Sequence, residues 1–263
     1  MATYLDTIVA GHRAAAAADT RDLASLVEQA SVLPATRPFA AALRADDDLA
    51  VVAEVKRRSP SRGPLALDLD PASLARSYQC GGASCLSVLT DEAHFGGSAA
   101  DLAEARGACA LPVLRKDFTV DLRDVADARL MGADAVLLIV AALDDDLLGA
   151  CLDLAAGLGL AALVEVHDEA ELGRAAALGA TLVGVNQRDL TTFEVDRTLA
   201  ARLHERMAPG VVSVAESGVR GAEDAVALAA AGYDAVLVGE TLVTSADPEA
   251  AVIDLRTGGG QTA

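Results

Sequence analysis

Aromatic side chains are scarce in this sequence, which has no tryptophan, three tyrosines and four phenylalanines among 263 residues. Proteins that hold single-stranded nucleic acid stack its bases on such rings, so this binding mode is not expected. Positive charge is also scarce, because 21 lysines and arginines face 39 acidic residues and leave a formal net charge of −18. That charge repels the phosphates of nucleic acids and of anionic lipid surfaces. The composition therefore predicts no nucleic-acid or membrane partner.

Other absences concern the cellular compartment. No stretch of ~18 uncharged apolar residues could span a membrane, and no basic segment precedes an apolar one at the N-terminus, as it would in a secretory leader. The four cysteines form no CxxC pair. These features are typical of a reduced, cytoplasmic protein. We expect Cys80 and Cys85 to pack as small apolar residues.

Motifs for metals and nucleotides are missing as well. The four histidines, at positions 12, 94, 167 and 204, are scattered along the chain, and Glu165 and His167 do not belong to an HExxH motif. We therefore predict no metal site. Neither GxGxxG nor GxxxxGK[ST] occurs, so the sequence indicates no dinucleotide or nucleoside triphosphate, and no cofactor is expected.

Eight short apolar runs are the dominant feature of what is present. They are nearly continuous in Val, Leu, Ile and Ala, as expected for parallel strands that are covered on both faces. Their starts lie about 26 residues apart, which is enough for a strand, a loop and a helix. The runs are Ala50–Val55, Ala83–Leu89, Leu111–Leu114, Ala133–Val140, Leu160–Val166, Thr181–Val185, Val211–Ala215 and Asp234–Val238.

Helix signals separate these runs. Asp70-Pro71, Ser98, Asp121 and Asp144–Asp146 are suited to helix starts. Glycines at 82, 132, 179 and 232 stand where helices are expected to end, just before the next run. Eight such units favour a closed α/β (β/α)₈ TIM barrel over the alternative, an open doubly wound sheet.

We read the chain as one domain. Residues 1–49 are predicted to be a helical N-terminal extension packed on the barrel, residues 50–256 the barrel, and residues 257–263 a frayed tail.

Two lysines draw attention, because the other 19 basic residues are arginines. Lys56 and Lys116 both stand at the ends of predicted strands, where a (β/α)₈ barrel carries its chemistry. Lysine transfers protons more readily than arginine does, because its pKa moves with its surroundings. If Lys116 acts as an acid, it has to give up a proton near the working pH. The alternative is that both lysines have survived by chance.

Further polar residues end the other strands, and they would converge at one mouth of the barrel. Glu54 lies two residues before Lys56, so the two side chains share a face and can pair. The set offers two acids, Lys56 and Lys116, and three bases, so proton transfer is indicated; structural ion pairs are the alternative. The bases and the other strand-end residues are Glu54, Glu165, Glu216, Asn186, Arg188 and Glu240.

Two glycines suggest a phosphate site. Gly218 and Gly239 follow the seventh and eighth predicted strands, where backbone N–H groups can approach a phosphate closely. At the same place we expect Glu240 to contribute its backbone N–H and to point its carboxylate away from the phosphate.

Whole motifs resemble one family. Glu54-Val-Lys-Arg-Arg-Ser-Pro-Ser61, Pro112-Val-Leu-Arg-Lys-Asp-Phe118, Leu163-Val-Glu-Val-His167, Gly184-Val-Asn-Gln-Arg-Asp-Leu190 and Val214-Ala-Glu-Ser-Gly218 are similar to indole-3-glycerol-phosphate synthase, in order and in register. The resemblance implies a carbon–carbon lyase of tryptophan or specialised indole biosynthesis. It would close the ring of 1-(2-carboxyphenylamino)-1-deoxyribulose 5-phosphate, with loss of CO₂ and water, to give indole-3-glycerol phosphate.

The resemblance also implies roles for individual residues. Lys116 matches the general acid, and Glu165 matches the group that handles a proton in the dehydration. Lys56 matches the lysine that contacts the anthranilate carboxylate and aids proton transfer. Glu54, Asn186, Glu216 and Arg188 match residues that orient these groups and the substrate. The phosphate site and the walls around the aromatic ring are matched by Ser59, Ser217, Gly218, Gly239 and Glu240, and by Phe118 and Leu190.

Two other functions remain open at this stage. A Schiff-base aldolase on the same barrel would use Lys116 as its nucleophile. A barrel that only binds a partner would have no need of proton carriers. For assembly, the resemblance leaves monomer and homodimer open and allows transient contact with other tryptophan-pathway enzymes.

Overall fold

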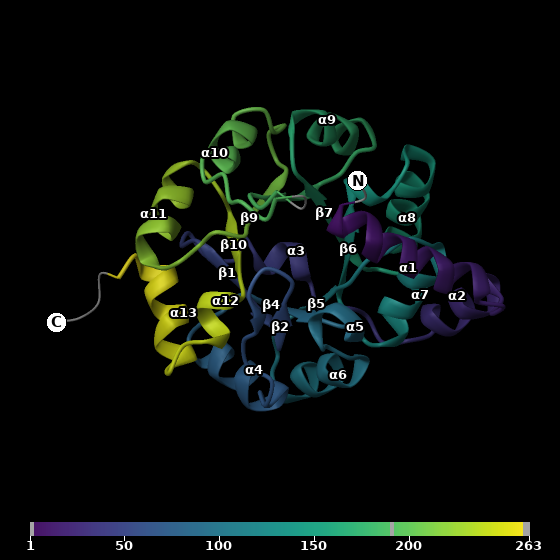
Figure 1. The fold of residues 1–263 in the computed structure, drawn as a ribbon, viewed down its shortest axis with the longest axis horizontal. Helices are drawn as coiled ribbons and strands as arrows, with labels where there is room; N and C mark the ends of the chain where they lie inside the picture. The colour runs from purple at the N-terminus through teal and green to yellow at the C-terminus, as the bar shows by residue number, and fades with distance from the viewer. Residues whose placement is uncertain (1–2, 190–191, 260–263) are drawn as a thin grey trace.

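Eight parallel strands close into a barrel in the computed structural model, which describes residues 3–189 and 192–259. The first strand, β1, pairs with β4 on one side and with β10 on the other, so the sheet has no free edge and the open-sheet alternative is excluded. Figure 1 shows the ring of helices around these strands. The strands are β1 (Ala50–Val55), β4 (Cys85–Leu89), β5 (Val113–Lys116), β6 (Ala135–Ile139), β7 (Ala161–Val166), β8 (Leu182–Asn186), β9 (Val212–Glu216) and β10 (Ala235–Val238).

All eight predicted strands are present, with bounds that move by up to two residues. Three strands, β5, β8 and β9, extend to the polar residue that was expected to come after them, so they end at Lys116, Asn186 and Glu216. A two-stranded hairpin that the apolar pattern did not predict, β2 (Arg58–Ser59) with β3 (Gly63–Pro64), follows β1.

The predicted helix signals are confirmed. Asp70, Ser98, Asp121 and Asp144 each accept a backbone N–H at a helix start, and the four predicted glycines have positive φ. The helices are α4 (Pro71–Cys80), α5 (Glu92–Phe95), α6 (Ala99–Ala108), α7 (Leu122–Leu130), α8 (Asp145–Gly157), α9 (Glu169–Ala177), α10 (Leu199–His204), α11 (Ala222–Ala230), α12 (Glu240–Val243) and α13 (Pro248–Thr257), with a 3₁₀ turn at Val140–Ala142.

Two sequence expectations fail at the surface. Thr257 was assigned to a frayed tail but is the last residue of α13, which ends at the left-handed Gly258. Cys80 is exposed at the end of α4, whereas Cys85 is buried as expected, because only Cys85 sits on a strand. Residues 260–263 of the predicted tail lie outside the described part of the chain. Among the described residues no helix is long and apolar enough to cross a membrane.

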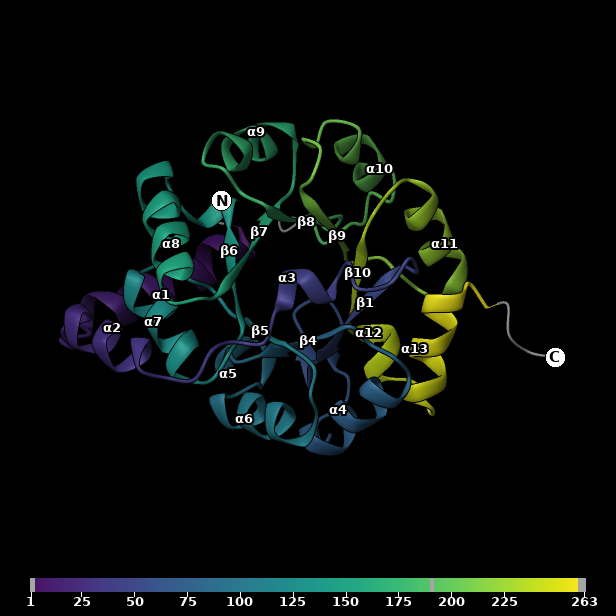
Figure 2. The same cartoon turned by 180° about the vertical axis from the view of Figure 1, so that it is seen from behind.

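The N-terminal segment forms helices α1 (Tyr4–Ala18), α2 (Leu23–Ser31) and α3 (Phe39–Ala42), as predicted. Figures 1 and 2 both show α1 and α2 beside α7 and α8. Phe39 of α3 and Leu43, which directly follows the helix, pack into the barrel interior. Next to it, Arg37 and Arg44 bind Asp134 and Asp234, at the N-terminal ends of two strands. Helix α3 therefore closes the end of the barrel opposite the strands' C-termini.

Each strand buries both faces, in alternation. In β1, Ala50 and Val52 face the barrel interior, whereas Val51, Ala53 and Val55 pack against the helices. The same alternation gives β5, β7 and β9 interior side chains such as Leu114, Leu163 and Val214. The interior is apolar up to this level, and the next inward position on each strand lies at the mouth.

Candidate active site

The polar residues at the mouth continue the inward-facing rows of the barrel. On each of four strands, a charged residue lies two positions after an interior-facing apolar residue. The pairs are Val52 and Glu54, Leu114 and Lys116, Leu163 and Glu165, and Val214 and Glu216. Because side chains alternate along a strand, these groups point to the barrel axis from four different strands. The convergence predicted from strand ends is therefore a direct result of the alternation.

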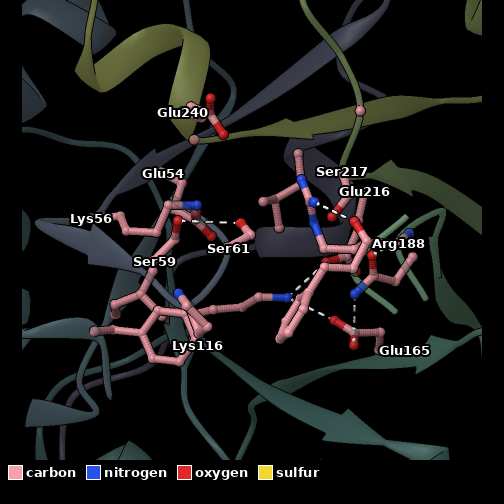
Figure 3. A pocket seen from close by; sticks show the side chains of 18 of the residues that line it. Glu54, Lys56, Ser59, Ser61, Lys116, Glu165, Arg188, Glu216, Ser217 and Glu240 are labelled. Carbon is pink, nitrogen blue, oxygen red and sulfur yellow. Dashed lines mark hydrogen bonds and ion pairs between the residues drawn. The ribbon is translucent and has the colours of Figure 1, made fainter. Parts of the chain in front are cut away.

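A cavity of about 350 Å³ opens at this mouth, within the range of small-molecule sites. Figure 3 shows the charged side chains directed into it. All but one of the predicted site residues line this cavity; Leu190 lies outside the described residues. The lining ones are Glu54, Lys56, Ser59, Lys116, Phe118, Glu165, Asn186, Arg188, Glu216, Ser217, Gly218, Gly239 and Glu240.

Lys116 is held between two carboxylates. Its Nζ donates to Glu165 Oε2 at 2.8 Å and to Glu216 Oε2 at 2.7 Å. Burial alone would lower the pKa of Lys116, but the negative charges of the two glutamates raise it above the usual value. The ammonium group thus stays protonated at neutral pH.

The two carboxylates that share Lys116 differ in their affinity for a proton. Burial alone would raise the pKa of Glu165, but the charges of Lys116 and His167 hold it well below the usual range. Burial, followed by repulsion from Glu165, raises the pKa of Glu216 to about 7. Near neutral pH the site therefore holds one ionised carboxylate and one that is poised to take or lose a proton.

Asn186 links this group to the next loop. Its Nδ2 donates to Glu165 Oε1 at 3.2 Å, and its Oδ1 accepts the backbone N–H of Arg188 at 3.1 Å. The Arg188 side chain donates to the carbonyl of Phe193 at 2.9 Å. Burial lowers the pKa of Arg188, yet arginine remains charged, so the cavity has a permanent cation here.

A second lysine–glutamate pair lies across the mouth. Lys56 Nζ donates to Glu54 Oε1, and Ser87 Oγ donates to Glu54 Oε2 at 3.4 Å. A Cβ atom at Gly239 would collide with both Glu54 and Lys56, and one at Gly184 would collide with Glu216. The glycine at 239 thus makes room for the charged pair, a role that its expected use as a phosphate contact did not reveal.

The loop after β9 has an unusual backbone. Ser217 has a φ of +65° and Gly218 a φ of +78°, and a non-glycine residue in this region is uncommon. The Nε2 of Gln187 donates to the Ser217 carbonyl at 2.8 Å and holds the turn. A Cβ at Gly218 would collide with Val195. Gly218 is therefore required by its backbone conformation and by the packing around it.

The hairpin after β1 covers the same part of the cavity. Ser59 is buried, and its Oγ accepts the backbone N–H of Arg62 at 3.2 Å. Arg62 Nε pairs with Glu240 Oε1 at 3.0 Å. The Glu240 carboxylate is therefore engaged by a cation of the hairpin.

Sequence reasoning missed several lining residues. Helix α1 contributes Tyr4, Leu5 and Ile8, because the N-terminal extension covers one side of the mouth. Arg62, Arg197 and Arg220 also line the cavity. Arg62 follows Ser-Pro-Ser and Arg220 follows Glu-Ser-Gly, so their closeness to recognised motifs was an available signal.

The histidines are less scattered than the sequence suggested. His12 Nε2 lies 3.0 Å from Asp91 Oδ2 and 3.9 Å from Asp117 Oδ1, so these three groups could together face a cation. Asp91 also accepts the backbone N–H of His94 at 2.6 Å. The hydrogen bond that His12 makes to the Asp91 carboxylate, opposed by burial, raises the pKa of His12. The cluster fastens α1 to the barrel beside Phe118, whose ring lies 5.4 Å from that of His12.

Comparisons with known proteins point to one family. The family profile described as "Indole-3-glycerol phosphate synthase" matches residues 5–255. The chain is 59% identical to "Indole-3-glycerol phosphate synthase 2" of Streptomyces coelicolor over 87% of this chain and 88% of the relative. It is 53% identical to the indole-3-glycerol phosphate synthase of Mycolicibacterium vanbaalenii over 98% and 95% of the two chains.

Solved structures with low identity share the fold alone. A 3-hexulose-6-phosphate synthase gives a TM-score of 0.62 at 19% identity, over 80% of this chain and 99% of the other. A thiamine phosphate pyrophosphorylase from Pyrococcus furiosus gives 0.60 at 18%, over 81% and 95%. With the family profile spanning nearly the whole chain and relatives above half identity, the chain belongs to the indole-3-glycerol phosphate synthase family.

Proposed function

We propose that the groups around Lys116 carry the proton transfers of the indole-3-glycerol phosphate synthase reaction, and that the groups around Lys56 hold the substrate's charges. The family assignment sets the overall reaction, a carboxy-lyase ring closure in tryptophan biosynthesis. The observation that carries the proposal is the placement of Lys116 between two carboxylates whose pKa values lie on opposite sides of the ordinary one.

The first step needs an acid at the ribulose carbonyl. The aromatic carbon that bears the carboxylate attacks this carbonyl, the new C–C bond closes the ring, and the carbonyl oxygen takes a proton. Lys116 is charged, directed into the cavity and able to give that proton to the strongly basic oxygen that forms. The carboxylate then leaves as CO₂ and its electron pair restores the aromatic ring.

The second stage removes water. The new hydroxyl leaves with a proton from an acid, and the neighbouring CH₂ loses a proton to a base, which forms the indole double bond. Glu165 is ionised and suited to move a proton in this stage, and Asn186 holds its other oxygen in place. Glu216, with its pKa raised to about 7 by burial, orients Lys116 and can receive protons.

The substrate's own charges need cations in a protein of net charge −18. Lys56 faces the cavity and would contact the anthranilate carboxylate, and Phe118 would pack against the ring. The backbone of Ser217, Gly218, Gly239 and Glu240, with the Ser59 hydroxyl, would hold the phosphate. Arg62, Arg188, Arg197 and Arg220 line the cavity and add positive charge there.

A Schiff-base aldolase is disfavoured by the same geometry. Such an enzyme needs a neutral amine as its nucleophile, whereas the two carboxylates keep Lys116 charged. The assignment is tested by supplying 1-(2-carboxyphenylamino)-1-deoxyribulose 5-phosphate and following the fluorescence of indole-3-glycerol phosphate. Absence of product, or a carbonyl substrate trapped on Lys116 by borohydride, would reject it.

The phosphate site can be tested without turnover. Inorganic phosphate should raise the thermal midpoint of the wild-type protein, because a ligand that binds only the folded state stabilises it. Gly218→Val should lose this effect and weaken substrate binding, since Gly218 has a φ of +78° and no room for a side chain. Sulfate-free chloride at matched ionic strength is the control. A wild-type midpoint that tens of millimolar phosphate leaves unchanged would contradict the site.

A further inference from the structure

His167 lies behind the proposed catalytic carboxylate. It is two residues beyond Glu165, where the chain leaves β7, and its imidazole stands between two acids. Its Nδ1 lies 3.0 Å from Glu171 Oε2 on α9, and its Nε2 lies 3.3 Å from Glu165 Oε1. The backbone N–H of His167 also donates to Glu171 Oε2 at 2.7 Å. Both ring nitrogens therefore face carboxylate oxygens.

A neutral imidazole would fit this position poorly. It carries one N–H and one lone pair, so one of its nitrogens would turn a lone pair toward a carboxylate. The protonated ring has two donors and a charge that both acids attract. Burial alone would lower the pKa of His167, but Glu165 and Glu171 raise it to about 10. The charged groups that face His167 are these two and, behind Glu165, Lys116 from β5 and Glu216 from β9.

The histidine also accounts for the difference between the two carboxylates at Lys116. Lys116 is shared almost equally, at 2.8 Å from Glu165 and 2.7 Å from Glu216, so it does not distinguish them. Glu165 has the His167 ring beside its Oε1 at an ion-pair distance of 3.3 Å, and no such group faces Glu216 among the ion pairs of the described residues. Neither Nε2 of His167 nor Oε1 of Glu216 makes a hydrogen bond in the described structure. Asn186 also touches Glu165 but carries no charge. The asymmetry of charge comes from His167.

We propose that His167 is a positioning residue that stays protonated between Glu165 and Glu171 and thereby keeps Glu165 ionised, which leaves Glu216 as the proton carrier of the pair. This inference rests on the proposed function, because it assigns the two glutamates different tasks in the same reaction. It gives no role in substrate contact to His167, which is not among the residues that line the cavity.

The test compares charge and shape at this position. His167→Gln removes the positive charge, and His167→Lys keeps it. An opposite charge within ~4–6 Å lowers a carboxyl pKa by about 1–3 units, so the acid limb of kcat should move up by about 1–3 pH units in His167→Gln and stay near the wild-type position in His167→Lys. His204→Gln is the matched control, because His204 packs on Tyr233 at 5.0 Å, away from the cavity.

The profile of kcat, taken from the lowest pH at which the wild type stays folded up to pH 9, decides between this role and a merely structural one. An equal loss of kcat at every pH in His167→Gln, with an unmoved acid limb, would overturn the proposal. A titration of the resting wild-type protein by ¹⁵N NMR gives a second decision, since His167 should remain protonated at pH 8 and a neutral ring there would also overturn it. Absence of product from the wild type would instead reject the proposed function, and the NMR titration would still judge His167.

Discussion

Lys116 and Lys56 both lie at the mouth of the barrel but in different electrostatic surroundings. Lys116 ends β5 two residues after the interior-facing Leu114, and Lys56 follows β1 two residues after Glu54. Their side chains are similarly exposed, at 15% and 16%. Lys116 faces two buried carboxylates, Glu165 and Glu216, whereas Lys56 pairs with Glu54 alone. The two sites therefore have the same residue type and nearly the same exposure, and they differ in the number of carboxylates that face the lysine.

The difference shows how one barrel mouth can separate two tasks. One lysine with two acids holds a proton that three groups can exchange, which suits proton transfer. One lysine with one acid is a nearly neutral pair that an anionic substrate group can join. The predictions below test whether the number of acids, and not the lysine itself, creates this difference.

The largest stability effect should come from removing the Lys116 charge. Lys116→Met leaves two carboxylates facing each other, and breaking a buried ion pair on one side costs about 3–5 kcal/mol. Lys56→Met should cost less, because it leaves Glu54 alone, with Ser87 still as a donor. Urea unfolding of both variants at pH 8 measures the two costs. Equal costs would show that the second acid adds nothing.

A smaller effect should follow pH through Glu216. Burial raises its folded-state pKa to about 7, above the unfolded value, so between about pH 4.5 and 7 the folded protein binds more protons than the unfolded one. Folding stability from this group is therefore lost as pH rises through that window. Glu216→Gln should gain roughly 2–3 kcal/mol relative to the wild type from pH 5 to pH 8, by the conversion of pKa units into free energy. Unfolding curves at several pH values measure this, and parallel pH profiles would reject the raised pKa.

The smallest effect is expected at the edge of the mouth. Glu240 pairs with Arg62, and both side chains are partly exposed, so the pair contributes little. Glu240→Ser should leave the Michaelis constant within about threefold, because the backbone N–H remains. Steady-state kinetics measure it, with Asp153→Ser at an exposed position of the outer helix α8 as the comparison. A tenfold improvement in KM would mean that the Glu240 carboxylate opposes the substrate phosphate.

Alternation along the strands made the positions of these residues predictable. Glu54 and Lys56 were expected to share a face, and they pair as expected. The partners of Lys116 were not predictable in the same way. Glu165 and Glu216 lie 49 and 100 residues from it in the sequence. That Lys116 binds these two glutamates and not Glu54 depends on how β5, β7 and β9 meet after the barrel closes.

Other features depend on long-range packing that the sequence pattern does not encode. The contact of His12 with Asp91 joins residues 79 apart and requires α1 to lie across the mouth. The pKa of Lys116 is shifted upward because the charges of two glutamates outweigh the effect of burial. The sequence of β5 alone indicates that Lys116 is buried, but it does not show which charges face it. His167 was visible in the motif after β7, but its second partner, Glu171, belongs to the next helix.

The central claim, that the Lys116 site moves protons and the Lys56 site holds charge, is tested most directly by single-turnover rates of ring closure in Lys116→Arg and Lys56→Arg. Arginine keeps the charge but does not release a proton near neutral pH. With saturating enzyme and circular dichroism to confirm folding, Lys116→Arg should slow product formation by roughly 10²–10⁴-fold, whereas Lys56→Arg should stay within about tenfold of wild type and raise mainly the substrate concentration needed. A Lys116→Arg rate above a tenth of the wild-type rate, or equal losses in the two variants, would contradict the account.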